Sequence, residues 1–220
     1  GGHFGIYDLD KHTFEINQWY SLEDRVNTYK HNGLPANESF KSIFEDSVRL
    51  RLRSDVNVGS CLSGGMDSSA IVTMMDDLLK KDDAKTVQHT ISSCFEDKAY
   101  DEQEYIDEVL KYTNTKGHKV FPNEDDLFKN IDKMIWHQDE PFGSTSIFAQ
   151  WTVFDKAKKE RLKVMLDGQG ADEQLAGYAS FFGPLCSESL RSFRWFRLFG
   201  QMRDLKGIHK SVEKATGYKG

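Results

Sequence analysis

The most informative stretch of this 220-residue chain is Ser63-Gly64-Gly65-Met66-Asp67-Ser68-Ser69. It follows a short apolar segment over 56–62 and opens a helical pattern over 68–80. Two consecutive glycines let the backbone approach a ligand closely, and the free N–H groups of a helix start favour negative charge. The serine hydroxyls add further donors. We therefore interpret this serine–glycine loop (residues 63–69) as a phosphate-binding loop between a strand and a helix.

This loop differs from a Walker A loop because it contains no Lys and carries Asp67 instead. A carboxylate beside a bound polyphosphate is repelled unless a cation lies between them. Mg²⁺ is the natural cation, because it prefers one or two carboxylates together with phosphate oxygens. The alternative is a simple turn in which Asp67 caps the helix that follows.

A second motif, Asp167-Gly168-Gln169-Gly170-Ala171-Asp172-Glu173, follows an apolar strand over 162–166 and is extended by Gly177-Tyr178. In a doubly wound sheet, ligands lie beyond the carboxyl ends of the strands, where the strand order reverses. If the strand before the serine–glycine loop comes first and the next two extend to one side of it, the strand over 162–166 lies on its other side. Both motifs then open onto one crevice, where Asp67 and Asp172 hold one Mg²⁺. Asp172 is also suited to the first turn of a helix.

The remaining pattern alternates strands with helices, which predicts an α/β fold: a doubly wound parallel sheet with helices on both faces. A hairpin occupies the first twenty residues, and a loop is expected over 21–35. The Arg- and aromatic-rich segment 188–206 suits a nucleic-acid or membrane surface, or an amphipathic helix that packs on the same protein. The acidic composition favours the helix. The predicted strands cover 56–62, 86–94, 118–121 and 162–166, and the predicted helices begin near 37 and cover 68–80, 101–113, 124–137 and 147–160.

The net charge of −6 argues against nucleic acid as the main partner. No apolar run is long enough to cross a bilayer, and no signal peptide is evident. The three cysteines form neither a disulfide framework nor a zinc spacing, so we expect reduced, buried thiols in a cytoplasmic protein. Because the first residue is Gly1 rather than Met, we expect a processed or engineered chain or an internal fragment.

Here the motifs acquire a family resemblance. The serine–glycine loop resembles the PP-loop of N-type ATP pyrophosphatases, and residues 167–173 with Gly177-Tyr178 resemble the matching motif of the asparagine-synthetase branch. The likeness spans roughly residues 36–180 and implies the adenine nucleotide alpha-hydrolase-like fold. Three further segments are similar to that branch: Arg51-Leu52-Arg53-Ser54-Asp55-Val56, Tyr100-Asp101-Glu102, and Asp139-Glu140-Pro141-Phe142 followed by Ser144-Thr145-Ser146.

The resemblance implies a carbon–nitrogen ligase that uses ATP and Mg²⁺. A carboxylate, that of the aspartate side chain in asparagine synthetase, attacks the α-phosphorus of ATP and pyrophosphate leaves. Ammonia from a glutaminase domain then displaces AMP and gives asparagine. That domain and its N-terminal Cys nucleophile are missing here, so we expect residues 1–35 to be a hairpin and linker from its end. Residues 36–180 are the expected synthetase domain, and 181–220 the start of a truncated helical region.

The resemblance also implies a set of site residues. Backbone near Leu62 and Ser93 would meet the adenine end of ATP, and Ser144 and Thr145 either bind substrate or form a polar loop that caps the helix near 147. The catalytic set is Asp67, Asp172 and Gln169; the nucleotide set is Leu62, Ser63, Gly64, Gly65, Asp67, Ser68, Ser69, Ser93, Asp167 and Gly168; the metal ligands are Asp67 and Asp172; the substrate set is Glu140, Ser144 and Thr145.

The chain departs from the family pattern at Gln169, where asparagine synthetases usually carry Glu. Because Gln cannot act as a general base, either the proton goes elsewhere or the nucleophile differs. The family's catalytic Lys, which lies well beyond the second motif, has no match before Gly220, so the fragment itself is expected to turn over poorly. Rival interpretations are another PP-loop enzyme such as NAD or GMP synthetase or a tRNA-modifying ligase, a β-lactam-type or peptide-cyclising synthetase of the same branch, and a nucleotide-binding module without catalysis. Homodimerisation stays open.

Overall fold

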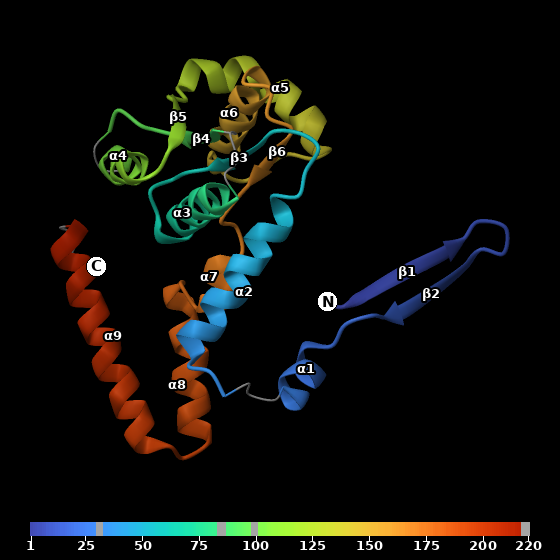
Figure 1. Ribbon diagram of the computed structural model, residues 1–220. Helices are drawn as coiled ribbons and strands as arrows, with labels where there is room; N and C mark the ends of the chain where they lie inside the picture. The colour runs from blue at the N-terminus through green and yellow to red at the C-terminus, as the bar shows by residue number, and fades with distance from the viewer. Residues whose placement is uncertain (30–32, 83–86, 98–100, 217–220) are drawn as a thin grey trace. The chain divides into compact units, whose positions relative to one another are not determined.

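A computed structural model describes residues 1–29, 33–82, 87–97 and 101–216 (Figure 1). The chain divides into two compact units, residues 1–47 and 48–220, and each is described by itself. The division falls inside helix α2 (Ala36–Arg51). The sequence places its boundary at residue 35, and the assignment of domains stays a prediction. Tyr100, part of one family-like segment, lies outside the described residues.

The first unit contains the predicted hairpin. Strand β1 (His3–Asp8) pairs antiparallel with β2 (Thr13–Gln18). The Asp8 side chain accepts the backbone N–H groups of Asp10 and Lys11, each at 3.0 Å, and so closes the turn. Most apolar side chains of the hairpin are exposed, as expected for a two-stranded sheet with no core of its own.

The loop predicted over 21–35 is wrong in part, because Leu22–Thr28 form helix α1. The Oγ of Ser21 accepts the N–H of Asp24 at 3.2 Å, which caps the helix. Glu23 and Asp24 add negative charge to the first turn, where the helix dipole favours it. The serine and the two acidic residues could be read from the sequence as a helix start. They stabilise a helix here even though the segment lacks apolar residues at helical spacing.

The second unit holds the parallel sheet. Its strands are β3 (Val58–Cys61), β4 (Gln88–Ser93), β5 (Thr115–Val120) and β6 (Val164–Leu166). Its helices are α3 (Met66–Lys81), α4 (Gln103–Tyr112), α5 (Glu124–Gln138), α6 (Ser146–Lys159), α7 (Ala171–Leu175), α8 (Phe182–Arg191) and α9 (Trp195–Thr216), with a short 3₁₀ turn at Ala179–Phe181. None of the described helices is long and apolar enough to span a membrane.

The order of the strands is β5-β4-β3-β6, and every pairing between them is parallel. Ser60 of β3 aligns with Thr90 of β4 on one side and with Leu166 of β6 on the other. The chain therefore starts at β3, extends to one side through β4 and β5, and then crosses to the opposite side. The predicted reversal of strand order next to the serine–glycine loop is confirmed.

Helices cover both faces of this sheet, as predicted. Figure 1 shows α3 and α4 on one face and α5 and α6 on the other. The α3–α4 side has a core in which Leu62 packs with Val72, Cys94 and Ile106. On the α6 side, the buried residues are Ile91, Val153, Ala157 and Leu162. Two separate apolar layers thus pack on the two faces of the sheet and hold the strands in place.

Two boundaries differ from the predictions. Strand β5 begins at Thr115 rather than at 118, because Gly117 interrupts the apolar pattern; a side chain there would clash with Leu110, whose Cδ1 would lie 2.5 Å away. The helix predicted over 188–206 is divided, since α8 ends at Arg191 and α9 begins at Trp195. Phe193 between them has φ 52°, which no α-helix accommodates. Packing of this segment on a neighbouring part of the protein stays a prediction.

Candidate active site

A cavity of about 210 Å³ lies where the strand order reverses, beyond the carboxyl ends of β3 and β6. Both motifs contribute to it, so the structure brings together segments that are about a hundred residues apart. The residues around it from β3 and the serine–glycine loop are Cys61, Ser63, Gly65, Asp67 and Ser68. Those from the second motif and just after it are Asp167, Gly168, Gln169, Gly170, Asp172, Glu173 and Tyr178.

The serine–glycine loop needs a glycine at its turn. Gly64 has φ +87°, a conformation that L side chains rarely adopt. A Cβ at this position would also lie 3.0 Å from the Cβ of Tyr105 and 3.1 Å from the carbonyl oxygen of Glu102. The start of α4 therefore packs directly on the turn and fixes where the loop can run.

Two serine hydroxyls brace the loop from inside. The Oγ of Ser68 donates to the carbonyl of Gly65 and accepts the N–H of Ser63, both at 3.2 Å. The two hydroxyls lie 3.0 Å apart, and the Oγ of Ser63 accepts the N–H of Gly65 at 3.2 Å. Ser68 is buried. Its hydroxyl shapes the loop, while the backbone N–H groups are the donors that suit an anion.

Helix α3 adds a positive electrostatic potential at this place. It is 16 residues long, and its N-cap residue Gly65 makes no side-chain cap hydrogen bond. The first N–H groups of any α-helix have no acceptor within the helix, and its dipole adds a partial positive charge there. The wall of the cavity at Gly65, Asp67 and Ser68 is therefore suited to phosphate oxygens.

The second motif contacts the first by backbone rather than by side chains. A Cβ on Gly168 would lie 3.2 Å from the Cβ of Asp67 and 3.3 Å from the backbone nitrogen of Ser68. Gly177 is held close to Asp172, whose carbonyl accepts its N–H at 2.8 Å. A Cβ on Gly177 would lie 1.9 Å from Oδ1 of Asp172. Glycine at position 168 lets the acidic motif lie directly on the start of α3, and glycine at position 177 leaves room for the Asp172 carboxylate.

The same cavity is also acidic. Asp67, Asp172 and Glu173 all line it, and the hydroxyl of Tyr178 donates to Oε1 of Glu173 at 3.1 Å. That hydrogen bond and the charge of Glu173 raise the pKa of Tyr178, and Asp172 and Asp67 raise it further. Several carboxylates beside a phosphate-type loop fit Mg²⁺, which prefers carboxylate and phosphate oxygens and reduces their mutual repulsion. Asp67 and Asp172 are the residues that we would assign to it.

Cys61 is a cavity residue that the sequence did not single out. Burial first, and then the charge of Asp167 and a hydrogen bond to it, raises the pKa of the Cys61 thiol to about 12. The Nε2 of Gln150 donates to Oδ2 of Asp167 at 3.3 Å and holds this carboxylate from the α6 side. The sequence could have indicated Cys61 by its position, because it is the last residue of β3 before the loop.

Some of the predicted nucleotide residues do not line the cavity. Gly64 and Ser69 belong to the loop but are not among the residues that line the cavity. Leu62 is only 1% exposed and packs in the core, while its N–H donates to the carbonyl of Ile91 at 3.0 Å. Ser93 ends β4, and its Oγ is buried without a hydrogen-bond partner among the described residues. An unpaired buried hydroxyl is costly, which makes Ser93 a candidate for a ligand contact.

The predicted substrate residues also lie apart from the cavity. Glu140, Ser144 and Thr145 are exposed on the loop between α5 and α6. The Oγ of Ser144 accepts the N–H of Ser146 at 3.2 Å and lies 2.8 Å from its hydroxyl. Thr145 is the N-cap residue of α6 but makes no side-chain cap hydrogen bond, so the loop is polar and begins a helix without the expected cap. A role of these residues in substrate binding stays a prediction.

A family model described as asparagine synthase matches residues 39–218. The chain belongs to the asparagine synthase family. A protein of Methanocaldococcus jannaschii, provisionally named asparagine synthetase (glutamine-hydrolyzing) 2, is 37% identical over 92% of this chain and 39% of its own length. Asparagine synthetase (glutamine-hydrolyzing) 1 of Bacillus subtilis is 32% identical over 67% of this chain and 22% of its own length. This chain therefore spans well under half of these relatives.

Among solved structures, the NH3-dependent NAD synthetase of Campylobacter jejuni is similar to this family member. The TM-score is 0.44 at 18% identity, over 66% of this chain and 62% of that protein. The α/β fold with helices on both faces of a parallel sheet rests on the strand order and the two cores described above.

Burial of the thiol, together with its contact with Asp167, predicts slow alkylation of Cys61. At about pH 8.5, where an ordinary thiol is half ionised, we expect Cys61 to react far more slowly with iodoacetamide than Cys186 in the same sample. Asp167→Asn removes the charge and should raise the rate at Cys61 by about tenfold, the effect of one pKa unit. Peptide mass spectrometry measures both rates. Equal rates at Cys61 in the two proteins would show that the carboxylate does not control this thiol.

The close approach at Gly177 predicts a specific loss in this asparagine synthase family member. Gly177→Ala forces the Asp172 carboxylate out of its place, because the new Cβ would overlap Oδ1. We expect Mg²⁺-dependent ATP binding to weaken by at least about tenfold with the far-ultraviolet circular dichroism unchanged. The control is Gly183→Ala on α8, where a Cβ would meet nothing within 4 Å. Titration calorimetry gives the affinities, and equal affinities for the two variants would contradict this role of Asp172.

Proposed function

We propose that this chain is the nucleotide-using part of an ATP-dependent amide-forming ligase. In the proposed reaction, a carboxylate attacks the α-phosphorus of ATP, pyrophosphate leaves, and ammonia then displaces AMP from the acyl group. The observation that carries the proposal is the shared cavity, which is lined by the first turn of α3, with its carboxylate Asp67, and by Asp172 and Glu173 of the second motif. Membership of the asparagine synthase family supports the same reaction class.

The serine–glycine loop would hold the β and γ phosphates as the leaving group. Its backbone N–H groups and the α3 dipole are in place before the reaction, so they stabilise the charge that develops on pyrophosphate without reorganisation. Asp67, at the end of the same loop, and Asp172 would hold Mg²⁺ beside these phosphates. When bound, Mg²⁺ neutralises phosphate oxygens and orients them. Ser63 and Ser68 keep the loop in one conformation through their mutual hydrogen bonds.

The size of the cavity indicates which part of ATP it would contain. Ligand pockets for whole cofactors usually measure about 300–1,000 Å³, so about 210 Å³ suits the polyphosphate end alone. The adenosine would lie along the carboxyl ends of β3 and β4. There the backbone near Leu62 and the unpaired hydroxyl of Ser93 offer polar contacts. Asp167 and Gly168 line the cavity between these two regions and would lie along the nucleotide.

Gln169 lines the same cavity and sets a limit on the chemistry. Its amide donates and accepts hydrogen bonds but cannot remove a proton at neutral pH. It would therefore orient the acyl group or the amine, and the amine would arrive unprotonated or lose its proton to another group. The proposed acid is the side chain of aspartate, and the proposed ammonia source is a glutaminase domain. Both rest on the names of the longer relatives.

Product identity tests the proposal most directly. The protein, supplied within its full-length parent where one exists, is incubated with Mg·ATP, aspartate and ammonium, and the nucleotides are separated. We expect AMP and pyrophosphate in amounts that depend on aspartate. AMP with a different acid, or with an internal amine as the nucleophile, would change the substrate and keep the adenylation. ADP and phosphate would overturn the proposal.

The metal assignment predicts the effect of Asp67→Asn. The variant keeps the size of the side chain and removes its charge, so we expect the Mg²⁺-dependent formation of AMP to fall by at least about 100-fold while the circular dichroism spectrum stays the same. Asp77→Asn on the exposed face of the same helix is the matched control and should keep full activity. Full activity of a folded Asp67→Asn protein would remove Asp67 from the metal site.

A further inference from the structure

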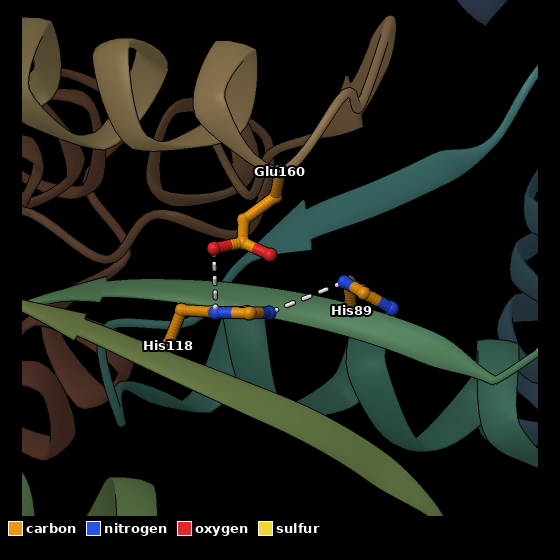
Figure 2. A group of neighbouring side chains, drawn as sticks. All are labelled: His89, His118 and Glu160. Carbon is orange, nitrogen blue, oxygen red and sulfur yellow. Dashed lines mark hydrogen bonds and ion pairs between the residues drawn. The ribbon is translucent and has the colours of Figure 1, made fainter.

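A second group of potential ligands lies on the α6 face of the sheet, over β4 and β5. His89 is the second residue of β4, and His118 of β5 is aligned with Ile91, two positions further along β4. Because alternate residues of a strand share a face, both imidazoles lie on the side of Ile91, which packs under α6. Glu160 follows the end of α6 and reaches the same point (Figure 2).

The donor atoms of these three side chains converge. The Nε2 of His118 lies 3.2 Å from the Nδ1 of His89, and the Nδ1 of His118 lies 3.4 Å from Oε1 of Glu160. One ligand atom from each residue lies within 4.8 Å of the other two. Within the described part of the chain, no other group of three His, Cys, Asp or Glu side chains has this property.

We propose that His89, His118 and Glu160 form a binding site for a divalent transition metal of the Zn²⁺ class. Zinc–nitrogen bonds are about 2.0–2.1 Å long, so two imidazole nitrogens on one tetrahedral ion lie about 3.3 Å apart. The separation of 3.2 Å between His118 and His89 fits this value without movement of either strand. Two imidazoles and one carboxylate, with a fourth position left for water, are a common zinc ligand set.

The surroundings of Glu160 suit a ligand. Lys156, one turn earlier on α6, has its Nζ 2.6 Å from Oε1 of Glu160, and the contact with His118 uses the same oxygen. Figure 2 shows the second carboxylate oxygen turned to the side where His89 lies. The lysine thus holds the carboxylate in place while leaving Oε2 for the metal. Such outer contacts orient metal ligands in proteins.

The site is shielded but can be reached. The side chain of His118 is 9% exposed and that of Glu160 is 23% exposed. A cavity of about 180 Å³ opens beside His89. It gives access to the imidazole of His89. The residues that line this cavity are Asn57, Val58, Val87, His89 and Leu162.

The metal site is separate from the proposed nucleotide site. His89 lies at the amino end of β4, whereas Ser93 and the serine–glycine loop lie beyond the carboxyl ends of the strands. A bound ion would join the end of α6 to β4 and β5, in addition to the apolar packing of α6 on the sheet and the contact between Glu160 and His118. The inference therefore stands on its own residues and does not depend on the reaction.

Zinc titration with matched variants tests the site. The protein is stripped of metal, kept in excess Mg²⁺ to fill the acidic cavity, and titrated with Zn²⁺ against a coloured chelator. We expect one Zn²⁺ per chain, and binding that is at least about tenfold weaker in His89→Asn and in Glu160→Gln. His137→Asn, which removes an exposed histidine of α5, should bind as the wild type does.

The opposing result is also defined. The same contacts can be a chain of hydrogen bonds, in which His89 donates to His118 and His118 donates to Glu160. Unchanged Zn²⁺ affinity in both variants would assign the cluster to hydrogen bonding alone and overturn the metal site. If the variants fail to fold, zinc-edge X-ray absorption of the wild type answers the question. Two imidazole ligands are expected, and their absence would overturn the site equally.

Discussion

The close approach of the Gly168 backbone to the start of α3 is the constraint on which the candidate active site depends. A single Cβ there would lie 3.2 Å from that of Asp67, so any side chain at this position would push the two motifs apart by a few tenths of an ångström. The parallel sheet brings them together by placing β6 beside β3 rather than beside β5. Two apolar layers keep that placement rigid. The strand order thus places the two motifs next to each other, and the glycine at position 168 allows their backbones to come a few tenths of an ångström closer.

The fold and the centre of the site could be predicted from sequence because their signals are local. Two glycines and an Asp after an apolar strand indicate a phosphate loop, and an alternation of strands with helices restricts where a second such motif can lie. Ser63, Asp67, Gly168 and Asp172 accordingly line one cavity. Two elements were mispredicted because only the spacing of apolar residues was considered. The cap at Ser21 starts a helix, and Gly117 interrupts the apolar pattern near the beginning of a strand.

What could not be predicted depends on pairs that are distant in sequence. The contact between Cys61 and Asp167 exists because β3 and β6 end side by side. His89, His118 and Glu160 come from two strands and a helix end, with no spacing that a metal motif would reveal. For the residues with a proposed substrate role, such as Ser144, the sequence predicted more than the structure shows. Their segment resembles a family motif, but the geometry of the described structure shows only the start of a helix.

The carboxylates that line the cavity together with the N-terminus of α3 have a thermodynamic consequence. Asp67, Asp172 and Glu173 repel an incoming polyphosphate as long as no cation offsets their charge, and the positive end of α3 disfavours a lone cation. Each partner therefore improves the site for the other. Because binding free energies are linked, the factor by which the cation tightens nucleotide binding equals the factor by which the nucleotide tightens cation binding. Such a cavity would bind the nucleotide and the cation together and would disfavour either of them alone.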